Sequence, residues 1–237
     1  MKFNINLSHS LAACLFGFSS LIYSQSEDQI TNFTKAAKFD DIFEVKSLIK
    51  AGVSPNTLDP NGNPMLFLAV KENSSKVIDY LTNLPGIDIN LPNKSGETPL
   101  MIASIEGNLP VVKYLVFTKK ADVNNSGWTP LQYACTRGHL EVAEFLVANG
   151  AKVNALSPNN STALMMSVMS GNEYLVKYLL DNGADLKIRN QQGLTAIDFA
   201  DIYTKPWIGD GLRSRWAKLY KSPYPEAPSR EIGRAHV

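Results

Sequence analysis

The chain is 237 residues long and carries 23 Lys and Arg residues against 22 Asp and Glu, a formal net charge of +1 at pH 7. Nonspecific binding to nucleic acids or anionic membranes depends on an excess of cations, so the composition argues against both. The one basic cluster, formed by Arg213, Arg215, Lys218 and Lys221, is typical of a solvated helix face.

Residues 1–24 are predicted to form a cleavable secretory signal peptide. Lys2 precedes an uncharged apolar run from Leu11 to Tyr23, and Ser24 and Ser26 offer small residues for cleavage. The run is shorter than the ~20 apolar residues that a membrane-spanning helix needs. The mature chain is therefore expected to be periplasmic or secreted, without insertion into the membrane.

A lipoprotein anchored at Cys14 is the alternative, because Leu11-Ala12-Ala13-Cys14 resembles a lipobox. The segment before Cys14 is polar, and the apolar core follows the cysteine instead of preceding it. This layout favours the cleavable signal peptide.

A motif close to Gly-x-Thr-Pro-Leu recurs about every 33 residues, which is typical of a stack of supersecondary units. Its copies open at Gly62, Gly96, Gly127, Asn160 and Gly193. Thr caps a helix and Pro suits its first position, so each copy is predicted to start a short helix. In the last four copies the helix is expected to start at Thr98, Thr129, Thr162 and Thr195. In the first four copies it is expected to end at Asn73, Gly107, Gly138 and Gly171.

A second helix is predicted in each unit from an apolar stripe of three-to-four-residue period, such as Val77, Ile78 and Leu81. A glycine follows most of these stripes and is expected to end the helix. The glycines are Gly52, Gly86, Gly150 and Gly183.

The pattern resembles ankyrin repeats, most clearly in Gly138-His139-Leu140-Glu141-Val142 and Gly150-Ala151-Lys152-Val153-Asn154. The resemblance covers residues 28–221 and implies an all-α solenoid of stacked helix-turn-helix units with short β-hairpin fingers. The expected units are an N-terminal capping unit 28–58, repeats 59–92, 93–123, 124–156 and 157–189, and a C-terminal capping unit 190–221.

The chain departs from the family pattern in three places. The His of the family's Thr-Pro-Leu-His is replaced, which puts the inter-repeat hydrogen bonds in doubt and predicts moderate stability. The finger before Trp128 is expected to be short, because Asn124 precedes Gly127 by only three residues. Two segments interrupt the last unit before a predicted closing helix from Leu212 to Tyr220: Lys205-Pro206-Trp207 and Gly209-Asp210-Gly211. The residues at the His position are Phe67, Met101, Gln132, Met165 and Asp198.

Residues 222–230 are interpreted as a tail. The codons for residues 231–237 would resemble a short-read sequencing adapter, so this segment is predicted to be an artefact. The natural chain is then expected to continue beyond about Arg230.

The sequence shows none of the convergent groups that an enzyme needs, and no enzyme, cofactor or metal site is predicted. His139 occupies the family's structural Gly-His turn. Cys135 is the one cysteine left after cleavage, so no intramolecular disulfide is expected, and its small-residue neighbours predict burial. Gly209-Asp210-Gly211 lacks the strand and spacing of a phosphate-binding loop.

The resemblance implies a monomer that binds an unknown protein partner through its concave face. Trp128 and Arg137 are the predicted centre, since Trp, Tyr and Arg dominate interface hot spots; alternatively, Trp128 merely covers the short finger. The other predicted contact residues are Ile105, Met169, Tyr203, Glu106, Thr136, Lys71 and Glu97.

Three roles fit such a module: a scaffold or assistant of a periplasmic enzyme, an immunity protein that neutralises a toxin, or a factor directed at a host. A different class also remains open. The chain would then be the ankyrin front end of a longer enzyme whose C-terminal part is missing.

Overall fold

The computed structural model describes residues 25–225, in which the chain forms twelve α-helices and one short π-helix and no β-strand. The expected signal peptide, Cys14 and residues 226–237 lie outside the described residues.

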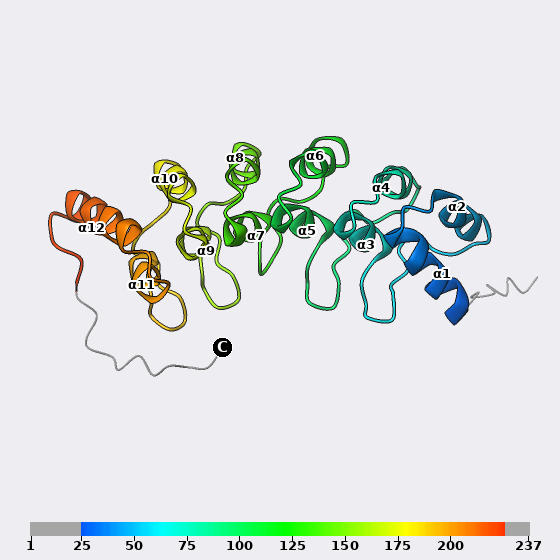
Figure 1. The fold of residues 1–237 in the computed structure, drawn as a ribbon, viewed down its shortest axis with the longest axis horizontal. Helices are drawn as coiled ribbons and strands as arrows, with labels where there is room; N and C mark the ends of the chain where they lie inside the picture. The colour runs from blue at the N-terminus through cyan, green and yellow to red at the C-terminus, as the bar shows by residue number, and fades with distance from the viewer. Residues whose placement is uncertain (1–24, 226–237) are drawn as a thin grey trace, which may run out of the picture.

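The helices form two rows in a curved stack (Figure 1). Each outer helix packs on the inner helix of its own unit, and successive inner helices contact each other. The inner row holds α1 (Glu27–Lys38), α3 (Met65–Lys71), α5 (Pro99–Ile105), α7 (Pro130–Arg137), α9 (Ala163–Ser170) and α11 (Ala196–Ile202). The outer row holds α2 (Ile42–Lys50), α4 (Ser75–Thr82), α6 (Leu109–Lys113) followed by the π-helix η1 (Tyr114–Thr118), α8 (Leu140–Ala148), α10 (Glu173–Asp181) and α12 (Pro206–Tyr220). The predicted solenoid is confirmed.

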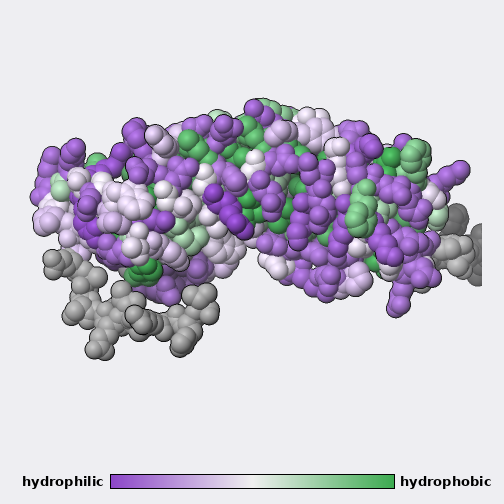
Figure 2. All heavy atoms as spheres, viewed as in Figure 1, coloured by the Kyte–Doolittle hydropathy of each residue, from purple (hydrophilic) through white to green (hydrophobic). Residues whose placement is uncertain are grey.

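Threonine caps start the inner helices as the motif predicts. Thr129 accepts a hydrogen bond from the backbone N–H of Gln132 at 3.2 Å, and Thr98, Thr162 and Thr195 cap their helices in the same way. The predicted turn residues, from Asn73 to Gly171, all have positive φ. One continuous hydrophobic core runs through the stack from Phe33 to Trp216. The face in Figure 2 is largely hydrophilic, with hydrophobic residues in smaller patches.

The fingers are hydrogen-bonded turns; a single isolated bridge, between Leu58 and Pro64, is the nearest approach to a hairpin in the described chain. Four fingers close through the same backbone bond, from an N–H to the carbonyl four residues later. The pairs are Asp59 with Asn63 (2.8 Å), Asn93 with Glu97 (2.9 Å), Ser157 with Ser161 (3.0 Å) and Asn190 with Leu194 (2.9 Å). The finger before α7 is visibly shorter than the others (Figure 1), as predicted.

Asparagine side chains that follow one outer helix bond to the backbone that follows the next outer helix, from α2 to α10. Asn56 donates to the carbonyl of Gly86 at 2.8 Å and accepts from the N–H of Asp88 at 2.9 Å. The equivalent bonds join Asn90 to Asp122, Asn124 to Gly150 and Lys152, and Asn154 to Gly183 and Asp185, all at 2.9 Å. The stack therefore has an inter-repeat network independent of the family's His position.

The doubt about the replaced His is only partly justified. Phe67, Met101 and Met165 are buried apolar residues at that position. Gln132, in contrast, is buried and donates to the carbonyls of Ala155 (2.9 Å) and Ser161 (3.0 Å) in the next unit.

The closing helix starts earlier than predicted, because α12 begins at Pro206 and runs through both glycines. A Cβ on Gly209 would lie 3.3 Å from the Cβ of Ala200 on α11. Glycine therefore lets the two helices approach closely, and the prediction of an interruption here was wrong.

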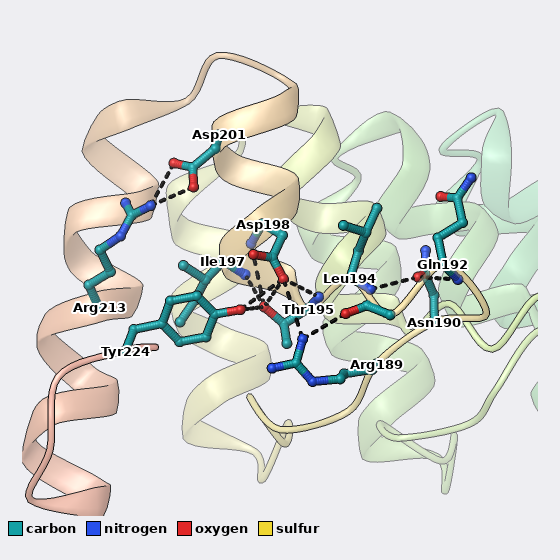
Figure 3. Close-up of polar contacts among 11 residues, drawn as sticks. Arg189, Asn190, Gln192, Leu194, Thr195, Ile197, Asp198, Asp201, Arg213 and Tyr224 are labelled. Atoms are coloured by element: carbon teal, nitrogen blue, oxygen red, sulfur yellow. Dashed lines mark hydrogen bonds and ion pairs between the residues drawn. The ribbon is translucent and has the colours of Figure 1, made fainter. Parts of the chain in front are cut away.

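Tyr224, which the sequence assigns to the tail, folds back onto α11 (Figure 3). Its hydroxyl lies 2.8 Å from both Asp198 Oδ2 and Thr195 Oγ1, and its ring meets Trp216 edge-on at 5.0 Å. Burial and the Asp198 carboxylate raise the pKa of Tyr224, so the phenol stays protonated and can donate. Residues 221–225 thus complete the C-terminal capping unit.

We expect Tyr224→Phe to lower the free energy of unfolding by about 1–2 kcal/mol, because it deletes a hydrogen bond to a carboxylate and keeps the ring. Urea unfolding followed by circular dichroism measures the change. Tyr174→Phe is the matched control, since Tyr174 is 77% exposed. Equal stability of the two variants would show that the hydroxyl contributes nothing.

The outer helix of repeat 93–123 ends in a left-handed lysine. Lys120 has φ 59° where Gly150 has φ 89° in the next repeat. The segment from Asn108 to Lys120 is one residue longer than the one from His139 to Gly150, and the π-helix η1 absorbs the extra residue.

Lys120→Gly is expected to raise the free energy of unfolding by about 0.5–1 kcal/mol, because glycine enters the left-handed region without the cost of a Cβ. Gly150→Ala should have the opposite sign; a Cβ there meets nothing within 4 Å, so only the backbone conformation penalises it. Thermal and urea unfolding of both variants test the pair, and destabilisation by Lys120→Gly would contradict it.

Candidate partner-binding surface

Trp128 stands where the short finger meets α7. It is half-buried, and its ring meets that of Tyr133 edge-on at a centroid distance of 6.3 Å. The Tyr133 hydroxyl donates to Glu97 Oε1 of the preceding repeat at 2.7 Å. Burial and the Glu97 carboxylate raise the pKa of Tyr133, so the phenol stays protonated and donates to Glu97. We refer to Trp128, Tyr133 and Glu97 as the Trp128 cluster.

A chain of hydrogen bonds extends from this cluster across two more fingers. Glu97 Oε2 accepts from Asn93 Nδ2 at 2.7 Å, and Asn93 Nδ2 also donates to Asn63 Oδ1 at 3.3 Å. Asn63 in turn donates to the Asp59 carboxylate at 3.1 Å. Three successive units are thus locked together on the finger side, and the aromatic pair is held in one orientation.

The short finger, which ends next to Trp128 in the sequence, reaches less far than its neighbours in the row (Figure 1). In this finger, Asn125 Oδ1 is buried and has no hydrogen-bond partner in the described part of the chain. An unpaired buried acceptor costs free energy, so this finger is less well satisfied than its neighbours.

The other predicted contact residues are spread along the inner row. Arg137 is exposed in the last turn of α7, roughly two helical turns from Trp128. Thr136 donates to the carbonyl of Gln132 at 2.9 Å, while Ile105 and Met169 pack partly against the core. Lys71, Glu106 and Tyr203 are exposed.

The structure therefore joins Trp128 to Glu97 and leaves Arg137 apart from them. Tyr133, which links Trp128 to Glu97, and Asn93, which links Glu97 to Asn63, were not among the predicted contact residues. Tyr133 could have been found from the sequence, because it lies in the repeat whose finger was predicted to be short.

His139 and Cys135 have structural roles. His139 Nε2 lies 2.9 Å from the carbonyl of Ile105, and its ring lies where a Cβ on Gly107 would come within 2.6 Å. Cys135 is 0% exposed and burial raises the pKa of its thiol.

Within residues 25–225, no group of three or more His, Cys, Asp and Glu residues is placed to hold a metal ion. None of the helices described has the length and apolar character needed to cross a membrane. The polar cluster around Asp198 (Figure 3) caps α11 and holds Tyr224.

Family models match three consecutive stretches of the chain. They are "Ankyrin repeats (many copies)" at residues 33–82, "Ankyrin repeats (3 copies)" at residues 83–157 and "Ankyrin repeat" at residues 159–191.

Curated relatives include the ankyrin repeat and SAM domain-containing protein 6 of Rattus norvegicus, 30% identical over 154 residues. That match covers 65% of this chain and 14% of the rat protein, so the chain spans a small part of that relative. An ankyrin-repeat protein of Treponema pallidum is 25% identical over 75% of this chain and 49% of its own length.

Among solved structures, one chain in the complex of the predatory endopeptidase Bd0816 from Bdellovibrio bacteriovorus with the immunity protein Bd3460 has the same fold. The TM-score is 0.66 at 24% identity, over 78% of this chain and 97% of that chain. This similarity shows the fold, and the family models, which together match most of residues 33–191, show that the chain belongs to the ankyrin-repeat family.

Proposed function

We propose that this chain is an exported, non-catalytic module that binds another protein through its concave face, centred on the Trp128 cluster. The observation that carries the proposal is the half-buried Trp128 held beside the short finger by the Tyr133–Glu97 bond. A half-buried aromatic side chain that is held in one orientation suits an interface hot spot, because little conformational entropy is lost when it binds.

The fold supports a protein ligand more than a small molecule. Ankyrin stacks offer extended concave surfaces to proteins, and the inner row presents exposed side chains of both signs, including Lys71, Glu106 and Arg137. A protein surface with mixed charge fits this row.

The partner is proposed to be an exported enzyme or toxin. The similar solved complex pairs an immunity protein with an endopeptidase, which supports the immunity role and, equally, the role of an assistant to a periplasmic enzyme. The second candidate is an ankyrin front end of a longer enzyme, supported by relatives that extend far beyond the matched region. Independent long-read sequencing past the Arg230 codon distinguishes the two classes.

Trp128→Ala is expected to weaken binding to the native partner by more than about 1 kcal/mol, roughly fivefold or more in Kd, because it removes the aromatic anchor. Arg137→Ala is expected to do the same through loss of an exposed cation. The partner is isolated by crosslinking from the native cell envelope, and Kd is measured by calorimetry.

Phe43→Ala serves as the control, since it removes an exposed aromatic residue of α2, outside the concave face. Circular dichroism must show that the variants keep their helical content. Unchanged affinity in both concave-face variants would place the binding site elsewhere.

Export predicts a mature chain that starts at Gln25 or Glu27, after cleavage at Ser24 or Ser26. Intact mass spectrometry of the protein from the periplasmic fraction or the medium measures its N-terminus. Cys14→Ser should leave this mass and the location unchanged. A lipid-modified N-terminus at Cys14, lost in the variant, would establish the lipoprotein instead.

A further inference from the structure

A second surface lies on the outer row, away from the fingers. A groove of about 600 Å³ separates α10 from α12, roughly twice the 320 Å³ hollow between α2 and α4 at the other end of the row. The closing helix α12 has 15 residues against 9 in α10. Its lining residues run from Trp207 to Leu219, so nearly the whole of α12 forms the second wall of the groove.

The groove has an apolar floor and aromatic walls. Val176, Leu180, Ile208 and Leu212 are buried beneath it. Its walls carry three large side chains in contact with solvent: Tyr174 is 77% exposed, Trp207 52% and Leu219 57%. Large exposed apolar side chains gathered around one groove are typical of interaction sites in soluble proteins.

Positive charge lines the groove. Lys177 and Arg215 share Asp181, at 2.7 Å and 3.0 Å. Lys218 forms no ion pair or hydrogen bond within residues 25–225, and Glu173 is the single carboxylate among the lining residues. Lys218 is therefore a free cation beside an apolar floor.

We propose that this groove binds an amphipathic helix of a second protein, with large apolar side chains against the floor and carboxylates against Lys218 and Lys177. Two neighbouring helices present ridges between which a third helix can pack, and helix-in-groove recognition uses apolar anchors one turn apart. The excess of cations selects acidic flanks. With two binding faces the chain is a connector between proteins, which favours the scaffold role over that of an inhibitor with a single target.

The test uses three labelled helical peptides that share one Leu/Trp stripe and carry Glu, Gln or Lys on the flanks. Fluorescence anisotropy measures their binding to the full chain. The Glu peptide is expected to bind about tenfold more tightly than the Lys peptide, and Leu219→Lys should weaken it by about tenfold or more. Lys218→Glu is expected to abolish the preference for Glu.

Phe43→Lys is the matched control, because Phe43 is 83% exposed on α2, outside the groove. It should leave peptide binding unchanged, as should Trp128→Ala, so failure of this proposal and failure of the concave-face proposal are distinguishable. Equal affinity for all three peptides, or full binding by Leu219→Lys, overturns the proposal. A dimer detected by sedimentation, in which a second copy of the chain fills the groove, also overturns the proposal.

Discussion

The stack depends on one recurring interaction, in which an asparagine side chain that follows one outer helix bonds to the backbone that follows the next outer helix. The finger segments have no β-ladder to satisfy their N–H and C=O groups, and such groups need partners. Asn56, Asn124 and Asn154 each supply one donor and one acceptor to that backbone. These bonds and the continuous hydrophobic core together hold neighbouring units in place.

This arrangement explains how one finger can be short without disturbing the stack. Asn124 keeps both bonds to the backbone after α8, and Asp122 keeps its bond to Asn90, which follows α4. The residues that this finger lacks are therefore missing from its tip alone. Trp128 follows the shortened tip, and the Tyr133–Glu97 bond holds the half-buried aromatic pair in place.

The features that recur with the repeat could be predicted from the sequence. The Thr caps, the positive-φ turns and the apolar stripes depend on residues within one unit, and the period makes each of them visible several times. Contacts between residues far apart in the sequence escaped prediction. Tyr133 with Glu97, Gln132 with Ser161 and Tyr224 with Asp198 each join residues more than twenty positions apart. The start of α12 was missed for a related reason. Glycine has a low helix propensity, and the close approach of Gly209 to Ala200 on α11 is not visible in the sequence.

The main contacts of each helix are with helices of its own unit and of the adjacent units. In such a quasi-one-dimensional array, a change in one repeat alters its neighbours and is scarcely felt further along the chain. The Trp128 cluster and the groove between α10 and α12 share no residue. Selection can therefore reshape either surface, or duplicate a repeat between them, while the other keeps its form.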